Sequence, residues 1–462
     1  MLDAAFFASH SNLIINTLYL QNVALSNHFH WWMGYEVEFI TKLYTLKPME
    51  SYLLDWANLL LRWVHVITAI AWVGSSFYFV FLDNNLLRPK SPDLLEKGVD
   101  GAMWAVHGGG FYNPQKYMIA PKTIHSKLHW FYWESYSTWL TGFALFTVLY
   151  LYNASTYLID KSLMNWSPGA AVGVALSFLV VFWMVYDAVC QLFGFRKNGE
   201  LIVGIVMLCV VTFASWLACH WFAGRAAFLL VGAMIATAMS ANVFFWIIPG
   251  QRKVVAAMTS DQPYDAKAMA IHGKRGKQRS VHNTYFTLPV IFAMLSNHYS
   301  FTYTHPQNWV ILVLMMFAGA AIRQYFVMRH SYKHGRSGNP WPYAAVGVAV
   351  IVGVIVWLGP NTNKAPSTTV APSVVIAPTV SSAAVAVDTV PVSVTKIIDQ
   401  RCLMCHGAQV QMKNIRLDSA ENLLKNKAMV YQQVVVTKQM PMNNSTGITP
   451  EERQMIADWA KP

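Results

Sequence analysis

Charged residues are scarce in this chain. Only 12% of its 462 residues are Asp, Glu, Lys or Arg, and 55% are hydrophobic, whereas a soluble protein has about 25% charged residues. This scarcity excludes an ordinary soluble fold and predicts an integral membrane protein in a lipid bilayer. Acidic residues are the scarcer class, with 22 against 34 basic ones. Because the positive excess lies in loops between apolar segments, it indicates membrane topology and not nucleic-acid binding.

Cysteine is scarce as well. The five cysteines are too few and too scattered for a disulfide framework. Cys190, Cys209 and Cys219 lie in apolar runs, where a buried, unreactive thiol is the simplest interpretation. No short N-terminal signal peptide is recognisable.

The remaining two cysteines form the sequence Cys402-Leu403-Met404-Cys405-His406, the attachment motif of c-type haem. Two thiols one helical turn apart can each add to a vinyl group of one porphyrin, and the following histidine becomes an axial ligand of the iron. A zinc site would need two more ligands, and this segment has no other Cys or His. Met440, before Pro441, is the predicted distal ligand, with Met442 as the alternative. We therefore expect one covalent haem c.

Eight segments are nearly free of charge and long enough to span about 30 Å of hydrocarbon. They are residues 53–82, 134–155, 168–192, 201–222, 226–248, 285–303, 309–328 and 342–359. They predict an all-α fold with an eight-helix transmembrane bundle.

Lysine and arginine are distributed unevenly between the loops that join these segments. The loops after the third, fifth and seventh segments hold two, seven and three of them, and those after the second, fourth and sixth hold one, one and none. Positive residues concentrate on the cytoplasmic side of a membrane. The odd-numbered loops are therefore predicted to be cytoplasmic. The haem motif then lies in the periplasm of a multi-pass protein of the bacterial inner membrane, the compartment where c-type haem is attached.

The rest of the chain divides by composition. Residues 1–50 are an ambiguous N-terminal extension, either a weak membrane helix or an interfacial segment, and residues 51–359 hold the bundle. Residues 360–394 are rich in Ala, Val, Pro, Ser and Thr and read as an extended tether. Residues 395–462 are expected to form a small all-α domain, like a class I cytochrome c. Its last helix should start after Thr449.

Ionisable groups inside membrane helices are costly and tend to mark function, and the first segment has the most. Its polar positions recur every three or four residues, on one helix face. They are Asp55, Asn58, Arg62, His65, Ala69, Trp72 and Ser76. Two interpretations stay open. Arg62 reaches back to the interface and His65 bonds a neighbouring helix, or His65 is a proton acceptor or an axial ligand of a b-type haem.

Other segments supply possible partners. A second ligand for a b-type haem would come from His298, or from His220 nearer the surface. Glu134, where the second segment begins, is a candidate proton acceptor. Asp187 and Arg323 are expected to form a solvated or paired rim near the cytoplasmic helix ends.

The first long loop, residues 83–133, contains His107 followed by three glycines and then Phe111-Tyr112. The glycines would let the backbone approach a ligand closely, and the aromatic residues could stack on a planar ring; a plain turn is the alternative. It is no dinucleotide fingerprint. Downstream, His125 and His129 are four residues apart and could bind a metal, although an aromatic interfacial belt explains the neighbouring tryptophans.

Five short stretches together carry a resemblance. They are Leu59–His65 with Trp72-Val73-Gly74, His107–Tyr112, Leu128-His129-Trp130 with Trp133-Glu134, Leu288–Phe292 with Asn297-His298-Tyr299, and Cys402–His406. With them the chain resembles the bacterial integral-membrane urate oxidases, or urate hydroxylases, that have a C-terminal cytochrome c domain. The resemblance runs from about Tyr52 to the end and leaves out residues 1–50.

The resemblance implies oxidation of urate to 5-hydroxyisourate. It also implies that electrons pass through haem c to a respiratory-chain acceptor, either cytochrome oxidase or a soluble cytochrome c. Urate is a planar anion at neutral pH, which suits Arg62 and aromatic neighbours. Protons would be taken by His65 or Glu134, and His298 and His107 complete the candidate catalytic set.

Three other functions fit parts of the same pattern. A different membrane dehydrogenase feeding cytochrome c would share every feature except the substrate pocket. A membrane-anchored electron shuttle would use the helices only to dock a partner complex. A permease fused to a cytochrome would need paired, interrupted helices, and the chain shows no convincing internal repeat.

Overall fold

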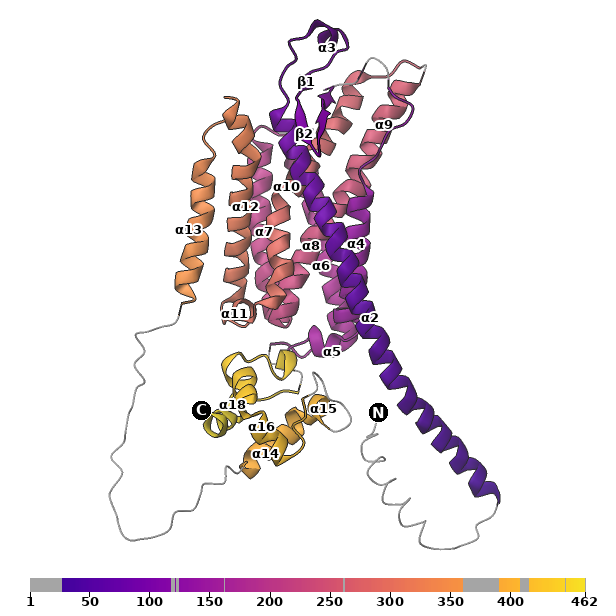
Figure 1. Ribbon diagram of the computed structural model, residues 1–462, viewed down its shortest axis with the longest axis vertical. Coiled ribbons are helices and arrows are strands. Elements are labelled where there is room, and N and C mark those ends of the chain that lie inside the picture. Colours follow the sequence, from indigo (N-terminus) through magenta and orange to yellow (C-terminus); the bar gives the residue numbers. More distant parts are fainter. Residues whose placement is uncertain are drawn as a thin grey trace, which may run out of the picture. The chain divides into compact units, whose positions relative to one another are not determined.

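The computed structural model describes residues 27–117, 121, 124–161, 163–260, 262–359, 390–407, 415–444 and 446–461. Side chains are described from Tyr52 onward, apart from Ala266, Ser300, Met404 and Asn443. Most of these residues are helical (Figure 1). The chain divides into two compact units, Met1–Leu60 and Leu61–Pro462, and the site described below lies in the second.

All eight predicted segments are helical. The first lies in α2 (Asn27–Asn85), which also covers the later part of the ambiguous N-terminal extension. The second comprises α4 (Trp133–Phe146), the π-helix η1 (Thr147–Leu151) and α5 (Ala154–Tyr157). The others lie in α6 (Pro168–Phe193), α7 (Gly199–Trp221), α8 (Gly224–Ala241) with the π-helix η2 (Asn242–Ile247), α10 (Ala266–Leu295) with η3 (Ser296–His298) and α11 (Ser300–Tyr303), α12 (Asn308–Lys333) and α13 (Trp341–Trp357).

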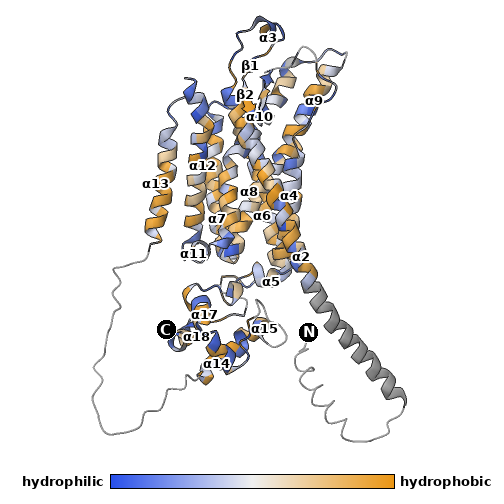
Figure 2. Cartoon of the chain, viewed as in Figure 1, coloured by the Kyte–Doolittle hydropathy of each residue, from blue (hydrophilic) through white to orange (hydrophobic). Residues whose placement is uncertain are grey.

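Five helices in the described part of the chain are long and apolar enough to cross a membrane. They are Tyr52–Asn85, Pro168–Phe193, Gly199–Trp221, Gly224–Thr259 and Asn308–Lys333, and Trp341–Trp357 is a shorter apolar helix. This confirms the membrane character; a bundle of eight crossings stays a prediction. The apolar residues of α13 and the polar stretches of α9 (Ile248–Thr259) can be followed in Figure 2.

The sixth segment was predicted too short. Its helix, α10, begins at Ala266 and not near residue 285, so many residues predicted to form a loop belong to two paired helices, α9 and α10. The sequence predicted a loop because lysines and arginines usually indicate exposure to water. The helix to which they belong, α10, nevertheless also has a buried face.

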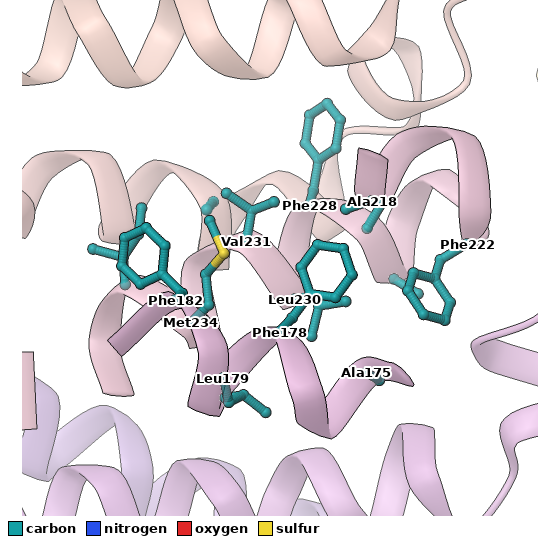
Figure 3. Packing of buried hydrophobic residues seen from close by; sticks show 14 of the residues in the cluster. Ala175, Phe178, Leu179, Phe182, Ala218, Phe222, Phe228, Leu230, Val231 and Met234 are labelled. Atoms are coloured by element: carbon teal, nitrogen blue, oxygen red, sulfur yellow. The ribbon is translucent and has the colours of Figure 1, made fainter. Parts of the chain in front are cut away.

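Helix α8 lies at the centre of the packing, in contact with α4, α6, α7 and α10. Small residues allow this. A side chain at Gly232 of α8 would meet the Ala293 Cβ of α10 at 2.9 Å, so the two helices are as close as their backbones permit. Figure 3 shows how aromatic and aliphatic side chains of α6 and α8, among them Phe178, Phe182 and Met234, fill the space between these helices.

The predominantly helical fold is confirmed, and the long loop after α2 adds a few short strands to it. After α3 (Pro92–Glu96), β1 (Gly101–Ala102) pairs with β4 (Gln115–Lys116), and β2 (Ala105–His107) pairs with β3 (Gly110–Tyr112). Gly108 and Gly109, at φ of 58° and 81°, form the two-residue turn between β2 and β3, because turns of this kind need positive φ at both positions. The glycines therefore form a turn, and contact of this loop with a ligand stays a prediction.

The C-terminal segment has a hydrophobic core of its own. Its helices are α14 (Val392–Arg401), α15 (Leu403–His406), α16 (Ala420–Lys425), α17 (Lys427–Val430), the π-helix η5 (Tyr431–Val436), the 3-10 helix η6 (Met442–Asn444) and α18 (Pro450–Ala460). The predicted last helix is confirmed, with Thr449 and Glu452 forming a capping box. The first 26 residues and most of the proposed tether, residues 360–389, lie outside the described residues.

Candidate functional site

The proposed haem-attachment residues share one tight turn. The Cys405 and His406 amides both donate to the Cys402 carbonyl, at 3.1 and 2.9 Å. Cys402 is buried in the C-terminal core and Cys405 is half-buried. Burial raises the pKa of the free Cys402 thiol to about 12 and also raises that of Cys405. The turn therefore brings both sulfurs and the imidazole to one edge of an apolar core.

The orientation of His406 suits an iron ligand. Its Nδ1 lies 3.2 Å from the Ile415 carbonyl oxygen. Because a carbonyl can only accept, Nδ1 carries the proton and Nε2 is left with a free lone pair. A second hydrogen bond of this kind is the usual way in which proteins fix the tautomer of a metal-binding histidine.

Met440 is better placed than Met442 as a distal ligand. Met440 packs against the same core as Cys402. Its backbone is fixed on both sides, since its N–H donates to Gln433 at 3.0 Å and the Arg453 guanidinium donates to its carbonyl at 2.8 Å. Met442 is half-buried at the start of η6 and does not belong to this core in the described residues.

A buried donor beside this core also fits the haem. The indole Nε1 of Trp459 is buried and finds no hydrogen-bond partner among the described residues, while the Lys427 ammonium lies 5.8 Å from the centre of the indole ring. A buried donor without an acceptor is costly. A carboxylate such as a haem propionate would satisfy it.

An ion pair fastens α18 to the helix before the haem motif. The guanidinium of Arg401, the last residue of α14, donates to both carboxylate oxygens of Glu452 at 2.9 to 3.3 Å. Burial alone would raise the pKa of Glu452. The hydrogen bonds from Arg401 and from the Thr449 N–H outweigh it and hold this pKa below its usual value.

In the membrane domain, His65 of α2 is held against α4. Its Nδ1 lies 3.1 Å from the Thr138 carbonyl oxygen and 3.2 Å from the Thr141 hydroxyl. The ring lies directly on the backbone at Gly142, where an added Cβ would be 2.7 Å from His65 Cε1. The interpretation that His65 bonds a neighbouring helix is therefore correct. Because Nδ1 donates to a carbonyl, Nε2 remains able to accept a proton or bind a metal.

The other predicted site residues are not gathered around His65. Arg62 is half-buried one turn earlier on α2, and Glu134 is half-buried in the first turn of α4. His298 is exposed in η3, and His107 is exposed in β2. Among the described residues, no hydrogen bond, ion pair or ring contact joins Glu134, His298 or His107 to His65, whereas the charge of Arg62 acts on the His65 ring. A b-type haem in the membrane domain stays a prediction.

The alternative histidines also stay apart. His220 bonds the Trp216 carbonyl one turn before it, at 2.7 Å, and stacks on that indole. His125 bonds the backbone of Lys127, and the His129 ring lies on Phe131. Of the residues that can be described, no three of the His, Cys, Asp and Glu type gather as a metal site would require. Metal binding by His125 and His129 stays a prediction.

The structure adds a buried polar network on α10 that the sequence interpretation missed. Arg279 has only 3% of its side chain exposed and forms an ion pair with Asp187 of α6 at 2.7 Å. The same guanidinium donates to the Asn242 side chain and lies over the rings of Tyr186 and Trp246. Asp187 is therefore a partner of a buried cation. Of the two expectations for Asp187, a solvated rim or a paired one, the paired arrangement is the one observed.

The network continues outward along α10. The His282 imidazole contacts Tyr186 Oη through Nδ1 at 2.9 Å and the Glu200 carboxylate through Nε2 at 3.0 Å. Gln278 donates to the same carboxylate at 2.8 Å. Because Glu200 is 62% exposed, a continuous chain of hydrogen bonds links solvent to the fully buried Tyr186.

Arg323 of α12 is buried and does not lie at a solvated rim. Its exposure is 1%, its Nε donates to the Thr284 carbonyl at 3.2 Å, and its guanidinium lies 3.6 Å from the centre of the Phe77 ring. Its Nη2 has no hydrogen-bond partner in the described part of the chain. None of the ion pairs within the described residues includes this side chain.

A signal for these residues was present in the sequence. Gln278, Arg279, His282 and Asn283 follow the i, i+1, i+4, i+5 spacing of one helix face, and the same face continues into Phe286 and Val290, which pack on the core. A polar stripe in phase with an apolar one indicates a single amphipathic helix. A count of charged residues alone does not reveal that the polar and apolar stripes have the same periodicity.

Comparison with known proteins gives one match. A family model described as urate oxidase N-terminal matches residues 51–359, about two thirds of the chain. No curated protein and no solved structure matches the chain. The matched region begins where the N-terminal extension was predicted to end.

Proposed function

We propose that this chain, which belongs to the urate oxidase N-terminal family, oxidises urate to 5-hydroxyisourate in the bacterial inner membrane and delivers the electrons to a covalent haem c. Family membership gives the chain a urate-related oxidation role. The proposal adds the product, the haem and a respiratory-chain acceptor, either cytochrome oxidase or a soluble cytochrome c. Urate and one water give 5-hydroxyisourate, two electrons and two protons, so the reaction balances without forming hydrogen peroxide.

One observation carries the electron-transfer part of the proposal. The family region is followed in the same chain by Cys402, Cys405 and His406, and His406 has its Nδ1 on the Ile415 carbonyl. Cys402 and Cys405 would hold the porphyrin, and His406 and Met440 would bind the iron. When bound, the haem accepts one electron at a time. The buried Trp459 N–H is the described donor that suits a propionate.

The membrane domain would supply the proton chemistry. The His65 Nδ1 donates to Thr138, which leaves Nε2 as a base of fixed tautomer and orientation. Glu134 is half-buried in the same helix as Thr138 and is the second candidate base. Arg62, one turn from His65, supplies positive charge beside this base. These roles remain proposals, as does the contribution of His298 and His107.

The loop charges support a defined topology. The odd-numbered loops would face the cytoplasm and the haem segment the periplasm, with eight membrane crossings. A periplasmic haem can reach soluble or membrane-bound acceptors directly. Both alternative functions share this topology. A different dehydrogenase would differ in its substrate, and an electron shuttle would have no substrate and would only dock a partner complex.

A spectroscopic experiment tests the proposal. The full chain is produced with a c-haem maturation system, its membranes are isolated without oxygen, and urate is added while the haem spectrum is recorded. Rapid appearance of the reduced c-type bands is expected, and b-type bands in addition would reveal a second haem. Reduction by dithionite but not by urate would refute urate oxidation. The electron shuttle predicts that no small metabolite reduces the haem.

A further inference from the structure

A cavity of about 320 Å³ opens at the lysine- and arginine-rich end of the bundle. It lies between the C-terminal end of α2, the β1–β4 pair, α10 and α12. Lys277, Val281 and Thr284 reach it from α10 at spacings of four and three, which place them on one helix face. Its volume lies at the lower end of the range of about 300–1,000 Å³ for small-molecule sites.

The charges in this cavity favour an anion. Three cationic residues and two carboxylates line it, which leaves one positive charge in excess. Lys116 is paired with Asp83 at 2.5 Å. Arg336 donates to the carbonyls of Leu86 and Asn84. Lys277 makes no hydrogen bond or ion pair with any described residue, so its ammonium is available to a ligand.

A second cation lies behind the cavity wall. Thr284 lines the cavity, and its carbonyl accepts the hydrogen bond from the buried Arg323. The unpartnered Nη2 of Arg323 leaves a charged group in a membrane helix incompletely satisfied, which is costly. An anion near Thr284 would lower that cost. Lys277, which lines the cavity, and Arg323, which lies behind Thr284, thus both favour an anionic ligand.

The remaining lining suits a flat ring. Val80, Val281 and Val327 give the cavity apolar surface from three different helices. Asp83 and Asp100 supply acceptors for ring N–H groups. A phosphate would use the cations but leave the apolar surface uncovered, whereas a heterocyclic anion has both an apolar face and N–H and carbonyl groups at its edge.

We propose that this cavity binds a planar organic monoanion, which is urate if the proposed function holds. Lys277 provides the charge at the mouth and Arg323 the charge behind Thr284. Because the positive loops mark the cytoplasmic side, urate would enter from the cytoplasm. The inference assigns a substrate site and the side of entry, neither of which follows from the family or from the haem motif.

The test uses the full haem-loaded chain in nanodiscs of zwitterionic lipid, without oxygen. Binding of labelled urate and the rate of urate-driven haem reduction are both measured against urate concentration. Lys277→Gln should weaken binding about tenfold and raise the half-saturating urate concentration by the same factor, with the maximal rate unchanged, because only a long-range charge is lost. Lys274→Gln is the matched control, since Lys274 is exposed on the same helix and does not line the cavity.

Arg323 provides the second variant. Arg323→Met should weaken urate binding, and Arg323→Lys should weaken it less because the charge is kept. Haem content and thermal unfolding of each variant show whether it has folded. Lys277 is exposed and has no hydrogen bond or ion pair to a described residue, so its variant tests the site even if the Arg323 variants do not fold.

The possible outcomes separate the site from the reaction. If wild-type haem is reduced by urate and Lys277→Gln behaves like wild type, the site is refuted and the proposed function stands. If urate binds in a Lys277-dependent way but never reduces the haem, the site stands and the proposed function falls. If urate does not bind the wild type, the site is refuted. Displacement of urate by an equal concentration of inorganic phosphate would also refute it, because the cavity would then be a general anion or lipid-headgroup site.

Discussion

Replacing Gly142 by alanine tests whether the placement of His65 against α4 matters for turnover. The added Cβ would lie 2.7 Å from His65 Cε1 and 3.2 Å from Nδ1, whereas carbon atoms in contact are about 3.5–4.0 Å apart. The ring must therefore move by about 1 Å. Such overpacking costs about 1–3 kcal/mol, and losing the bond to Thr138 costs about 1 kcal/mol.

Because a displacement of a reacting group by about 1 Å can lower a rate by about a hundredfold, the expected result is a fall in urate-driven haem reduction of up to about a hundredfold. Stopped-flow absorption measures it, with haem content as the check on folding. Gly173→Ala is the control, because a Cβ there meets nothing within 4 Å. Gly142→Ala should also add no further loss to a His65→Ala variant. Equal rates for Gly142→Ala and Gly173→Ala would refute a role for His65 in turnover.

Three further predictions concern the haem ligand, acid stability and the buried network. Met440→Ala should remove the thioether–iron signature from the oxidised haem spectrum, and the same change at Met442 should leave it; the reverse result would exchange the two assignments. Because the pKa of Glu452 is lower in the folded protein than in the unfolded one, this group stabilises the C-terminal segment above pH of about 4.3, and the contribution is lost as pH falls through the folded pKa. Glu452→Gln should therefore flatten the stability profile in that acidic range, as followed by the haem spectrum during acid titration of the full chain, and an unchanged profile would contradict it. Asp187→Asn should destabilise the membrane domain by about 3–5 kcal/mol because it leaves Arg279 as a buried, unpaired charge, and thermal unfolding in detergent would show a wild-type midpoint if that pair were unimportant.

What could be predicted from the sequence was what local spacing determines. The helix positions follow from runs of apolar residues, and the Thr449 cap follows from residues within four positions of one another. The turn at Gly108 and Gly109 could also have been predicted, since two adjacent glycines between short extended segments are a strong hairpin signal. Weighing these glycines as a possible ligand loop gave too little weight to that signal.

What could not be predicted depends on pairs of residues far apart in the chain. The buried state of Arg279 requires Asp187 and Asn242, which lie on other helices, and no spacing within α10 reveals them. The position of His65 depends in the same way on the lack of a side chain at Gly142, 77 residues later. Counting charges correctly indicated that the region around α10 is positively charged. It also predicted that all residues of this region are exposed to water, because the count ignores which helix face each charge occupies.

The two sites together constrain the path of the electrons. If urate binds beside Asp83, at the cytoplasmic end of α2, and the haem is periplasmic, electrons must pass through the bundle. His65 lies 18 residues earlier on the same helix, about 27 Å along its axis at 1.5 Å per residue, which is most of the distance across about 30 Å of hydrocarbon. Its free Nε2 could bind a second redox group, but no described histidine reaches it from a neighbouring helix. An electron path of this length would need an intermediate carrier, either a b-type haem or a quinone. A cytoplasmic substrate site without any such carrier would leave the haem out of reach.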